Sequence, residues 1–183
     1  QVIQIGDASG GVFEGLQRTQ ICGSFPDQSP DRQAIFLAKY ELTKGQFAAV
    51  MGLDALAAVS GNPEDAGIAD LQGRRRMEAL MQPLSFVSYF DIQEFIRRYN
   101  QWLFHPQHPE RLENMPKVKG VPGFFRLPTE EEWEFTARSG LEALENKMFQ
   151  DRLPFAQREL NEHAWHLGNA KHKVRPIGLR QPS

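Results

Sequence analysis

Two pairs of histidines have the residue type and the spacing that could contribute to a metal site. His105 and His108 lie three residues apart, and so do His163 and His166. A metal site needs three or four ligands that converge in space, commonly with help from carboxylates or thiolates. The first pair stands beside prolines in a predicted loop, and the second pair flanks a tryptophan in a predicted strand. We therefore expect these histidines to be exposed or locally bonded, and not to ligate a metal.

The acidic side chains of residues 130–134 could form the carboxylate pair that general acid–base catalysis uses. Thr129 precedes them, and Glu132 stands at the position that closes a capping box with that threonine. Glutamates in the first turn of a helix also complement the positive end of the helix dipole. Capping and dipole complementarity account for these residues, so we predict a helix start and no catalytic carboxylate.

Cys22 is the one cysteine of the chain, so the chain has no internal disulfide, Cys-rich metal site or paired-cysteine redox centre. We expect its thiol to behave as a small buried group. The sequence also lacks a G-x-S-x-G nucleophile motif, a phosphate-binding glycine loop and a zinc-protease H-E-x-x-H motif. The residues therefore predict no catalytic, cofactor-binding or metal site.

The composition is that of an ordered globular protein. The chain has 183 residues, is 40 % apolar, and carries 21 Lys and Arg against 23 Asp and Glu, a net charge of −2. This length predicts one domain over residues 1–183. The balanced charge does not favour nucleic acid as a partner. No apolar run approaches the ~20 residues of a membrane-spanning helix, so no direct membrane span is expected.

Three helices are predicted from their caps and apolar periodicity, over residues 43–51, 88–103 and 129–139. Thr43 with Gln46 forms one predicted capping box, and Ser88 with Asp91 marks the start of the helix with the clearest apolar repeat. Within the third helix we predict that Trp133 is a core anchor, packed beside the apolar residues that precede the helix.

Apolar segments predict short strands over residues 2–5, 34–42, 83–87, 124–127 and 164–169. The regions 53–82 and 104–122 have little periodicity and read as irregular loops, apart from a short exposed helix near residues 73–81. Within that helix, Arg74–Arg76 are expected to form a solvated face, with an anion-binding patch as the alternative.

The stretch "FRLPTEEEWEFTARSG" closely resembles the signature of the formylglycine-generating enzyme, or sulfatase-modifying-factor, family. Three further segments resemble that family in the expected order, and the resemblance covers most of residues 34–182: "YELTKGQFAAVMG", "QPLSFVSYFDIQEFIRRYNQWL" and "HAWHLGNAKHKVRPIGLRQP". The resemblance implies an α+β fold, a variant of the C-type-lectin-like architecture. Such a fold has small twisted sheets, two or three main helices and much irregular loop.

The resemblance does not carry the family's oxidase activity to this chain. The oxidase members use a pair of cysteines near the C-terminus to bind copper and activate oxygen, whereas Cys22 lies in another part of this sequence. The calcium-binding segment of the oxidases is not recognisable around residues 161–169, so calcium is implied by the family alone. We expect no enzyme and no cofactor, and a domain that lacks the family's C-terminal part after Ser183.

A narrower resemblance joins these segments with "FIRRYNQWL" and "RPIGLRQP" to the branch found with bacterial type VI secretion systems. That branch implies a non-enzymatic periplasmic regulatory or protein-binding module, acting upstream of a membrane-spanning serine/threonine kinase. The expected partner is the periplasmic part of the kinase or an outer-membrane lipoprotein. Because the chain begins at Gln1, we expect a secretory signal to have been removed.

Two alternatives stay open: a truncated oxidase that acts on a peptide cysteine, and a carbohydrate-binding module. For the leading hypothesis, the interaction surface is expected on the loops 53–82 and 104–122.

Overall fold

The computed structural model describes residues 2–5, 19–22, 35–60, 63–137 and 157–181. The chain divides into two compact units. The helical unit consists of residues 36–126 and 165–179, and the strand unit consists of residues 1–35, 127–164 and 180–183. No described helix is long and apolar enough to cross a membrane.

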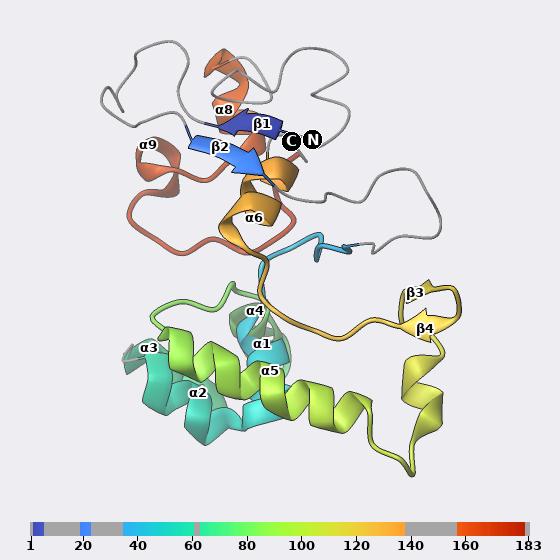
Figure 1. Ribbon diagram of the computed structural model, residues 1–183. Helices are drawn as coiled ribbons and strands as arrows, with labels where there is room; N and C mark the ends of the chain where they lie inside the picture. Colours follow the sequence, from blue (N-terminus) through green and yellow to red (C-terminus); the bar gives the residue numbers. More distant parts are fainter. Residues whose placement is uncertain (1, 6–18, 23–34, 61–62, 138–156, 182–183) are drawn as a thin grey trace. The chain divides into compact units, whose positions relative to one another are not determined.

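The helical unit contains most of the described helices (Figure 1). These are α1 (Lys44–Met51), α2 (Leu53–Ser60), α3 (Pro63–Ala66), α4 (Gly73–Leu80), α5 (Tyr89–Leu103) and α9 (Leu167–Ala170). The 3₁₀ turns η1 (Gly67–Asp70) and η2 (Pro109–Leu112) and the paired strands β3 (Lys117–Val118) and β4 (Val121–Pro122) complete it. The short helix predicted near residues 73–81 is present as α4. The rest of the region 53–82 was predicted as irregular loop, but its described residues are mostly helical.

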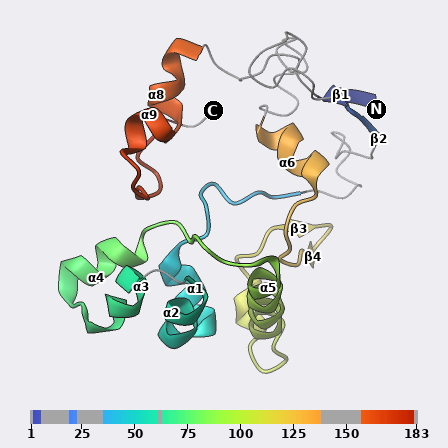
Figure 2. The ribbon, with the colours of Figure 1, turned by 90° about the vertical axis from the view of Figure 1, so that its left-hand side faces the viewer.

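The core of the helical unit forms where α1, α2, η1 and α5 meet. Its buried members are Phe47, Leu56, Ile68, Phe95 and Ile96. The rings of Phe47 and Phe95 stack with their centroids 5.7 Å apart, which joins α1 to α5. Figure 2 views α5 close to its axis and shows α1 beside it. The first part of the apolar repeat that predicted α5, Ile92, Phe95 and Ile96, therefore marks the face that packs on this core.

The predicted capping boxes set the starts of α1 and α5. At α1, the backbone N–H of Gln46 donates to Thr43 Oγ1 at 3.1 Å, and the Thr43 N–H donates to Gln46 Oε1 at 2.9 Å. At α5, Ser88 and Asp91 exchange the same two bonds, at 3.2 and 2.9 Å. These pairs satisfy donors that the helix itself leaves unpaired, so both predicted starts are confirmed.

A buried ion pair secures the first turn of α1. Lys44 Nζ donates to Asp65 Oδ1 at 2.7 Å and to Gln82 Oε1 at 3.0 Å. The side chains of Lys44 and Asp65 are 3 % and 2 % exposed. The second carboxylate oxygen of Asp65 is also buried, and it has no hydrogen-bond partner among the described residues.

Several predicted strands are wrong. Residues 35–42 and 84–87 form no strand, and between them only Thr43 and Pro83 make an isolated antiparallel bridge. The Leu84 N–H donates to the Leu42 carbonyl at 2.7 Å, and the Lys44 N–H donates to the Gln82 carbonyl at 2.9 Å. The pairing extends no further, so apolar composition predicted longer strands than the backbone forms. Ala34 lies outside the described residues.

The predicted strand at 164–169 is also wrong, because a helix cap lies within it. His166 Nδ1 accepts from the Gly168 N–H at 3.2 Å, and Asn169 Oδ1 accepts from the His166 N–H at 2.8 Å. This histidine capping box begins α9 at Leu167.

The segment after α9 returns to the start of the helical unit. Gly178 has a φ of +70°, and a Cβ at this position would lie 3.3 Å from Cε1 of Tyr40. A glycine allows both the left-handed backbone and the close approach to the ring.

The strand unit contains β1 (Val2–Ile5) and β2 (Thr19–Cys22), which pair antiparallel with Val2 opposite Cys22. Its described helical segments are α6 (Glu130–Ala137), η3 (Gln157–Glu159) and α8 (Leu160–His163). The predicted strand at 2–5 is confirmed, whereas residues 124–127 form no strand. The structure does not describe the Cys22 side chain, so its predicted burial stays a prediction.

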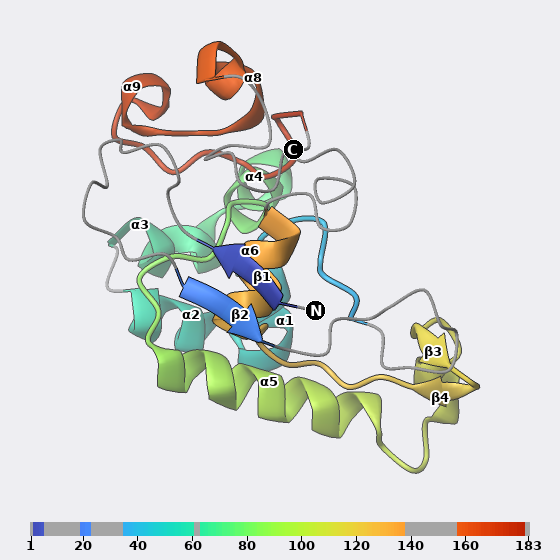
Figure 3. The same ribbon diagram turned by 45° about the horizontal axis from the view of Figure 1, so that its top comes forward.

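The fold is α+β and rich in loops, with small two-stranded sheets, as predicted (Figure 3). All three main predicted helices are present, as α1, α5 and α6. The third was predicted to reach residue 139, and its last two predicted residues lie outside the described part. That residues 1–183 form one domain, shortened at its C-terminal end, stays a prediction.

Candidate protein-interaction surface

An aromatic ladder runs along α5 from the core to the surface. The rings of Phe95 and Tyr99 stack at 6.1 Å, and those of Tyr99 and Trp102 stack at 5.7 Å. The spacing of four and then three residues places all three rings on one helix face. Phe95 is buried, whereas Trp102 is 49 % exposed. The indole of Trp102 is therefore held by stacking on Tyr99 and is half-exposed to solvent.

Phe125 packs against the side of this ladder, and the side chain of Asn100 bonds to its backbone. Its ring meets Tyr99 edge-on at 5.3 Å. The side-chain amide of Asn100 donates to the Phe125 carbonyl at 2.7 Å and accepts from the Phe125 N–H at 2.9 Å. Asn100 thus gives Phe125 the two bonds that a neighbouring strand would give. This explains how a residue of the predicted strand 124–127 is held without a sheet.

Arg111 covers the exposed ring of Trp102. The guanidinium carbon lies 4.4 Å from the centre of the indole, and Nη1 donates to the Trp102 carbonyl at 2.7 Å. A cation is favoured at this place, both by the aromatic face and by the negative end of the α5 dipole. We call Tyr99, Asn100, Trp102, Arg111 and Phe125 the Trp102 cluster.

The first histidine pair lies beside this cluster and is bonded locally, as predicted. His105 Nδ1 accepts from the Gln107 N–H at 3.3 Å, and His108 Nδ1 lies 3.0 Å from Glu110 Oε1. The pKa of Glu110 is lowered, chiefly by a hydrogen bond from the backbone N–H of Glu110 itself and next by the hydrogen bond with His108. No group of three or more metal-ligating side chains occurs among the residues that the structure describes. In the second pair, His166 caps α9 instead.

Arg97 and Arg98 on α5 differ from Arg111 because each forms a salt bridge with a carboxylate, that of Glu94. Arg97 Nη2 and Arg98 Nε both donate to Glu94 Oε1 at 2.7 Å. These hydrogen bonds, with that of Arg97 the larger cause, lower the pKa of Glu94 to about 2.

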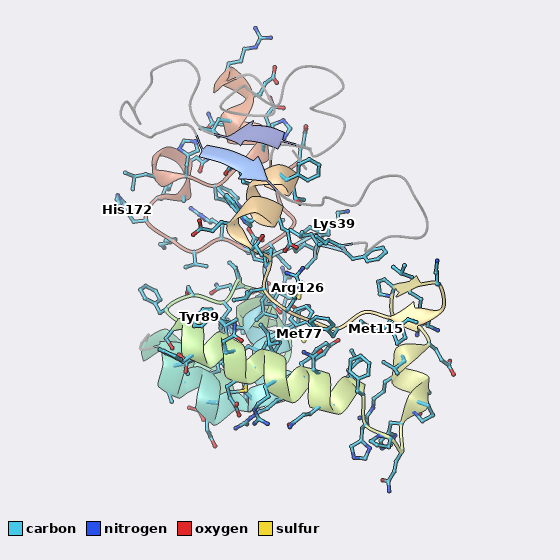
Figure 4. The ribbon with its side chains drawn as sticks, in the orientation of Figure 1. Lys39, Met77, Tyr89, Met115, Arg126 and His172 are labelled. Atoms are coloured by element: carbon cyan, nitrogen blue, oxygen red, sulfur yellow. The ribbon has the colours of Figure 1, made fainter. Side chains whose placement is uncertain are left out.

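Two labelled residues in Figure 4 mark the two ends of α5. Tyr89 marks the first residue of α5, and Met115 lies beyond the other end of the helix, in the segment between η2 and β3. The Trp102 cluster occupies the Met115 end. It therefore involves part of the predicted interaction region 104–122, but not the region 53–82.

The basic run on α4 was predicted as a solvated face over Arg74–Arg76, and Arg74 and Arg75 are exposed. Arg74 pairs with Glu78 at 2.7 Å, and both side chains are largely exposed. Arg76 is half-buried. Exposed pairs of this kind contribute little to stability, about 0.3–0.5 kcal/mol each.

The opening of α6 contradicts the prediction that Trp133 is a core anchor. The cap is present: the Glu132 N–H donates to Thr129 Oγ1 at 3.2 Å, and Glu132 Oε2 accepts from the Thr129 N–H at 2.8 Å. Trp133, however, is 57 % exposed. It lines an open hollow of about 420 Å³ together with Leu127, Pro128, Thr129, Glu130 and Glu134. Capping thus explains Glu132, as predicted, while the indole is not in the core.

Sequence patterns did not point to Arg111 or Asn100. Arg111 lies in a proline-rich segment without a period, and its position over Trp102 depends on how that segment folds back. Asn100 stands within the helix among polar neighbours, where its contact with the distant residue Phe125 has no local signal.

Comparison with known proteins identifies the family. The family model of the sulfatase-modifying factor enzyme 1-like domain matches residues 2–183. No match was found among curated proteins or among solved structures. Since the family model spans nearly the whole sequence, the chain belongs to the sulfatase-modifying factor enzyme 1-like family.

Proposed function

We propose that this chain is a non-enzymatic protein-binding module of the bacterial periplasm, acting upstream of a type VI secretion serine/threonine kinase. Its narrower resemblance to the type VI secretion branch supports the setting. The observation that carries the binding role is the Trp102 cluster, in which a half-exposed tryptophan stacks with Tyr99 and contacts the guanidinium of Arg111.

The residue types and the rigidity of the cluster suit a binding surface. Trp, Tyr and Arg are the residues most enriched among those that dominate interface energies. Trp102 and Arg111 are held by stacking and by the bond to the Trp102 carbonyl. Side chains that are already ordered lose less entropy when a partner binds, so a preorganised cluster gains affinity.

The chemistry of the oxidase members does not fit the residues of this chain. Their copper centre requires two cysteine thiolates, and this sequence supplies Cys22 alone. We therefore derive no oxidation step, and the proposal assigns no catalytic residue and no cofactor.

The direct test is binding to the periplasmic part of a type VI secretion serine/threonine kinase from the same bacterium, measured by isothermal titration calorimetry. We expect Trp102→Ala to weaken binding at least about thirtyfold, the effect of losing about 2 kcal/mol. Arg74→Ala on α4 is the matched control and should bind like the parent, because Arg74 lies outside the cluster in an exposed pair.

Thermal melts of each variant separate lost binding from lost folding. An absence of binding to both the kinase domain and the outer-membrane lipoprotein would overturn the proposal. Binding to a glycan array in the presence of calcium would instead favour a carbohydrate-binding module.

A further inference from the structure

We propose that the Trp102 cluster receives an acidic segment of its protein partner, and that Arg111 binds the carboxylate. This inference rests on the proposed function, because it names the chemistry that the same surface would recognise.

The first argument is that Arg111 forms no salt bridge with a carboxylate among the described residues, although its charge contributes to the lowered pKa of Glu110. Arg74 pairs with Glu78, and Arg97 and Arg98 share Glu94, each at 2.7 Å. Arg111 instead donates from Nη1 to the Trp102 carbonyl. A guanidinium has five N–H donors in a planar fork, so donors remain for a ligand after this one bond.

The second argument is orientation. The indole of Trp102 lies 4.4 Å from the guanidinium carbon and covers one face of the charged group, while the bond to the backbone fixes its rotation. A planar guanidinium held in this way is suited to bidentate contact with a carboxylate, which a flexible lysine cannot reproduce.

The third argument is the charge around this end of α5. Lys117 and Lys119 are exposed on the β3–β4 hairpin, which Figures 1 and 3 show beyond the C-terminal end of α5. Glu110 and Glu113 lie close to Arg111 in sequence and oppose an anionic ligand. Glu110 Oε1 lies 3.0 Å from His108 Nδ1. Because the Glu110 carboxylate repels an anionic ligand, removing its charge should strengthen the binding of an acidic ligand.

A second contact between an arginine and a tryptophan, that of Arg175 with Trp165, provides a matched control. Arg175 lies 5.3 Å from the centre of the Trp165 ring, and its Nε donates to the Ala170 carbonyl at 3.1 Å. This arrangement resembles that of Arg111, but it lies in a different segment of the helical unit. Arg175→Gln thus removes the same kind of cation without touching the Trp102 cluster.

The test uses a synthetic glycine-flanked hexaglutamate peptide and its glutamine analogue, titrated into ¹⁵N-labelled protein. We expect the glutamate peptide to shift the indole N–H signal of Trp102 and the Nε–H signal of Arg111, and the glutamine peptide to shift neither. Arg111→Gln should weaken binding at least tenfold, Arg111→Lys should weaken it less, and Glu110→Gln should tighten it. Arg175→Gln should bind like the parent.

Three results would overturn the inference: equal binding of the two peptides, equal binding of the parent and Arg111→Gln, or the same loss in Arg175→Gln as in Arg111→Gln. If Arg111→Gln fails to fold, the parent still decides the question. The glutamate peptide must then shift the Nε–H signal of Arg111 but not that of Arg175, and its affinity must fall as sodium chloride rises from about 50 to about 500 mM, because screening weakens exposed charge pairs.

Failure of this inference is distinguishable from failure of the proposed function. If the kinase domain binds the parent and Arg111→Gln equally, the protein-binding role stands and the carboxylate site is wrong. If neither the kinase domain nor the outer-membrane lipoprotein binds the parent, the proposed function is wrong, whatever the peptides show.

Discussion

The helix starts at Thr43 and at Thr129 use the same local chemistry and differ in their surroundings. Each threonine caps its helix and exchanges two bonds with the residue three positions later. Four positions after the cap stands an aromatic residue, Phe47 in one helix and Trp133 in the other. Phe47 is fully buried, whereas Trp133 is 57 % exposed.

This difference teaches that a cap determines where a helix begins, but not what its first apolar side chain contacts. A capping box consists of bonds among four consecutive residues, so it needs no partner from elsewhere in the chain. Burial of Phe47 requires α2, η1 and α5 to supply apolar neighbours. Trp133 lies at the wall of an open hollow instead.

The largest expected effect comes from replacing the two aromatic residues separately. Phe47→Ala should lower the free energy of unfolding by about 3–5 kcal/mol, because it leaves a cavity in the core. Trp133→Ala should lower it by less than about 1 kcal/mol, as is usual for an exposed side chain. Urea titrations of both variants measure the difference. Equal losses would show that the indole packs as tightly as Phe47, and the comparison would fail.

The next effect concerns the charge that follows each cap. Lys44 is buried and paired with Asp65, so Asp65→Ala should cost about 3 kcal/mol by leaving the ammonium group buried without its partner. Glu130, the corresponding residue of α6, is exposed, and Glu130→Ala should change stability by less than about 0.5 kcal/mol.

A double variant, Lys44→Met with Asp65→Leu, tests the cause of that loss. It should be far more stable than Asp65→Ala, because it removes both buried charges. A double variant as unstable as Asp65→Ala would mean that shape, and not charge, sets the cost.

Loss of the caps themselves should have a smaller and nearly equal effect in the two helices. Thr43→Ala and Thr129→Ala each remove one side-chain acceptor from a helix start, which costs about 1 kcal/mol. Serine at either position keeps the acceptor and serves as the control. A loss at Thr43 several times that at Thr129 would indicate that burial, as well as capping, depends on the threonine.

The smallest effect is expected from the surface charges of α5. The pKa of Glu94 is lowered from 4.5 to about 2 by Arg97 and Arg98, so its contribution is present above about pH 4.5. That contribution is lost as the pH falls towards 2. Thermal melts between pH 6 and pH 2 should therefore show a shallower acid loss in Glu94→Gln than in the parent. Parallel curves would show that solvent screens these bonds completely.

The parts of the fold that could be predicted from sequence are those set by neighbouring residues. The starts of α1, α5 and α6 were predicted because Thr43, Ser88 and Thr129 bond to residues three positions later. The predicted strands at 34–42 and 83–87 were wrong because a strand needs a distant partner, and apolar composition does not say whether one is there.

The Trp102 cluster was only partly predictable, for the same reason. The spacing of Phe95, Tyr99 and Trp102 predicts one helix face, and the loop 104–122 was expected to carry the interaction surface. The positions of Arg111 and Phe125 depend on two segments that fold back onto α5. No local pattern in the sequence predicts that these segments contact the helix.

The contact between Tyr40 and Gly178 has a consequence for how the chain folds in time. These residues are 138 positions apart in the sequence (178 − 40), yet both belong to the helical unit. A ribosome releases the residues of α1 to α5 long before Gly178 emerges, so these helices can collect around Phe47 while the last segment is still unmade. Bringing Gly178 to Tyr40 closes a long loop, and this costs conformational entropy that must be lost before the contact stabilises the fold. Contacts between residues far apart in the sequence therefore slow folding. We therefore expect two kinetic phases: a fast one for the helices, and a slow one in which the returning segment docks on Tyr40.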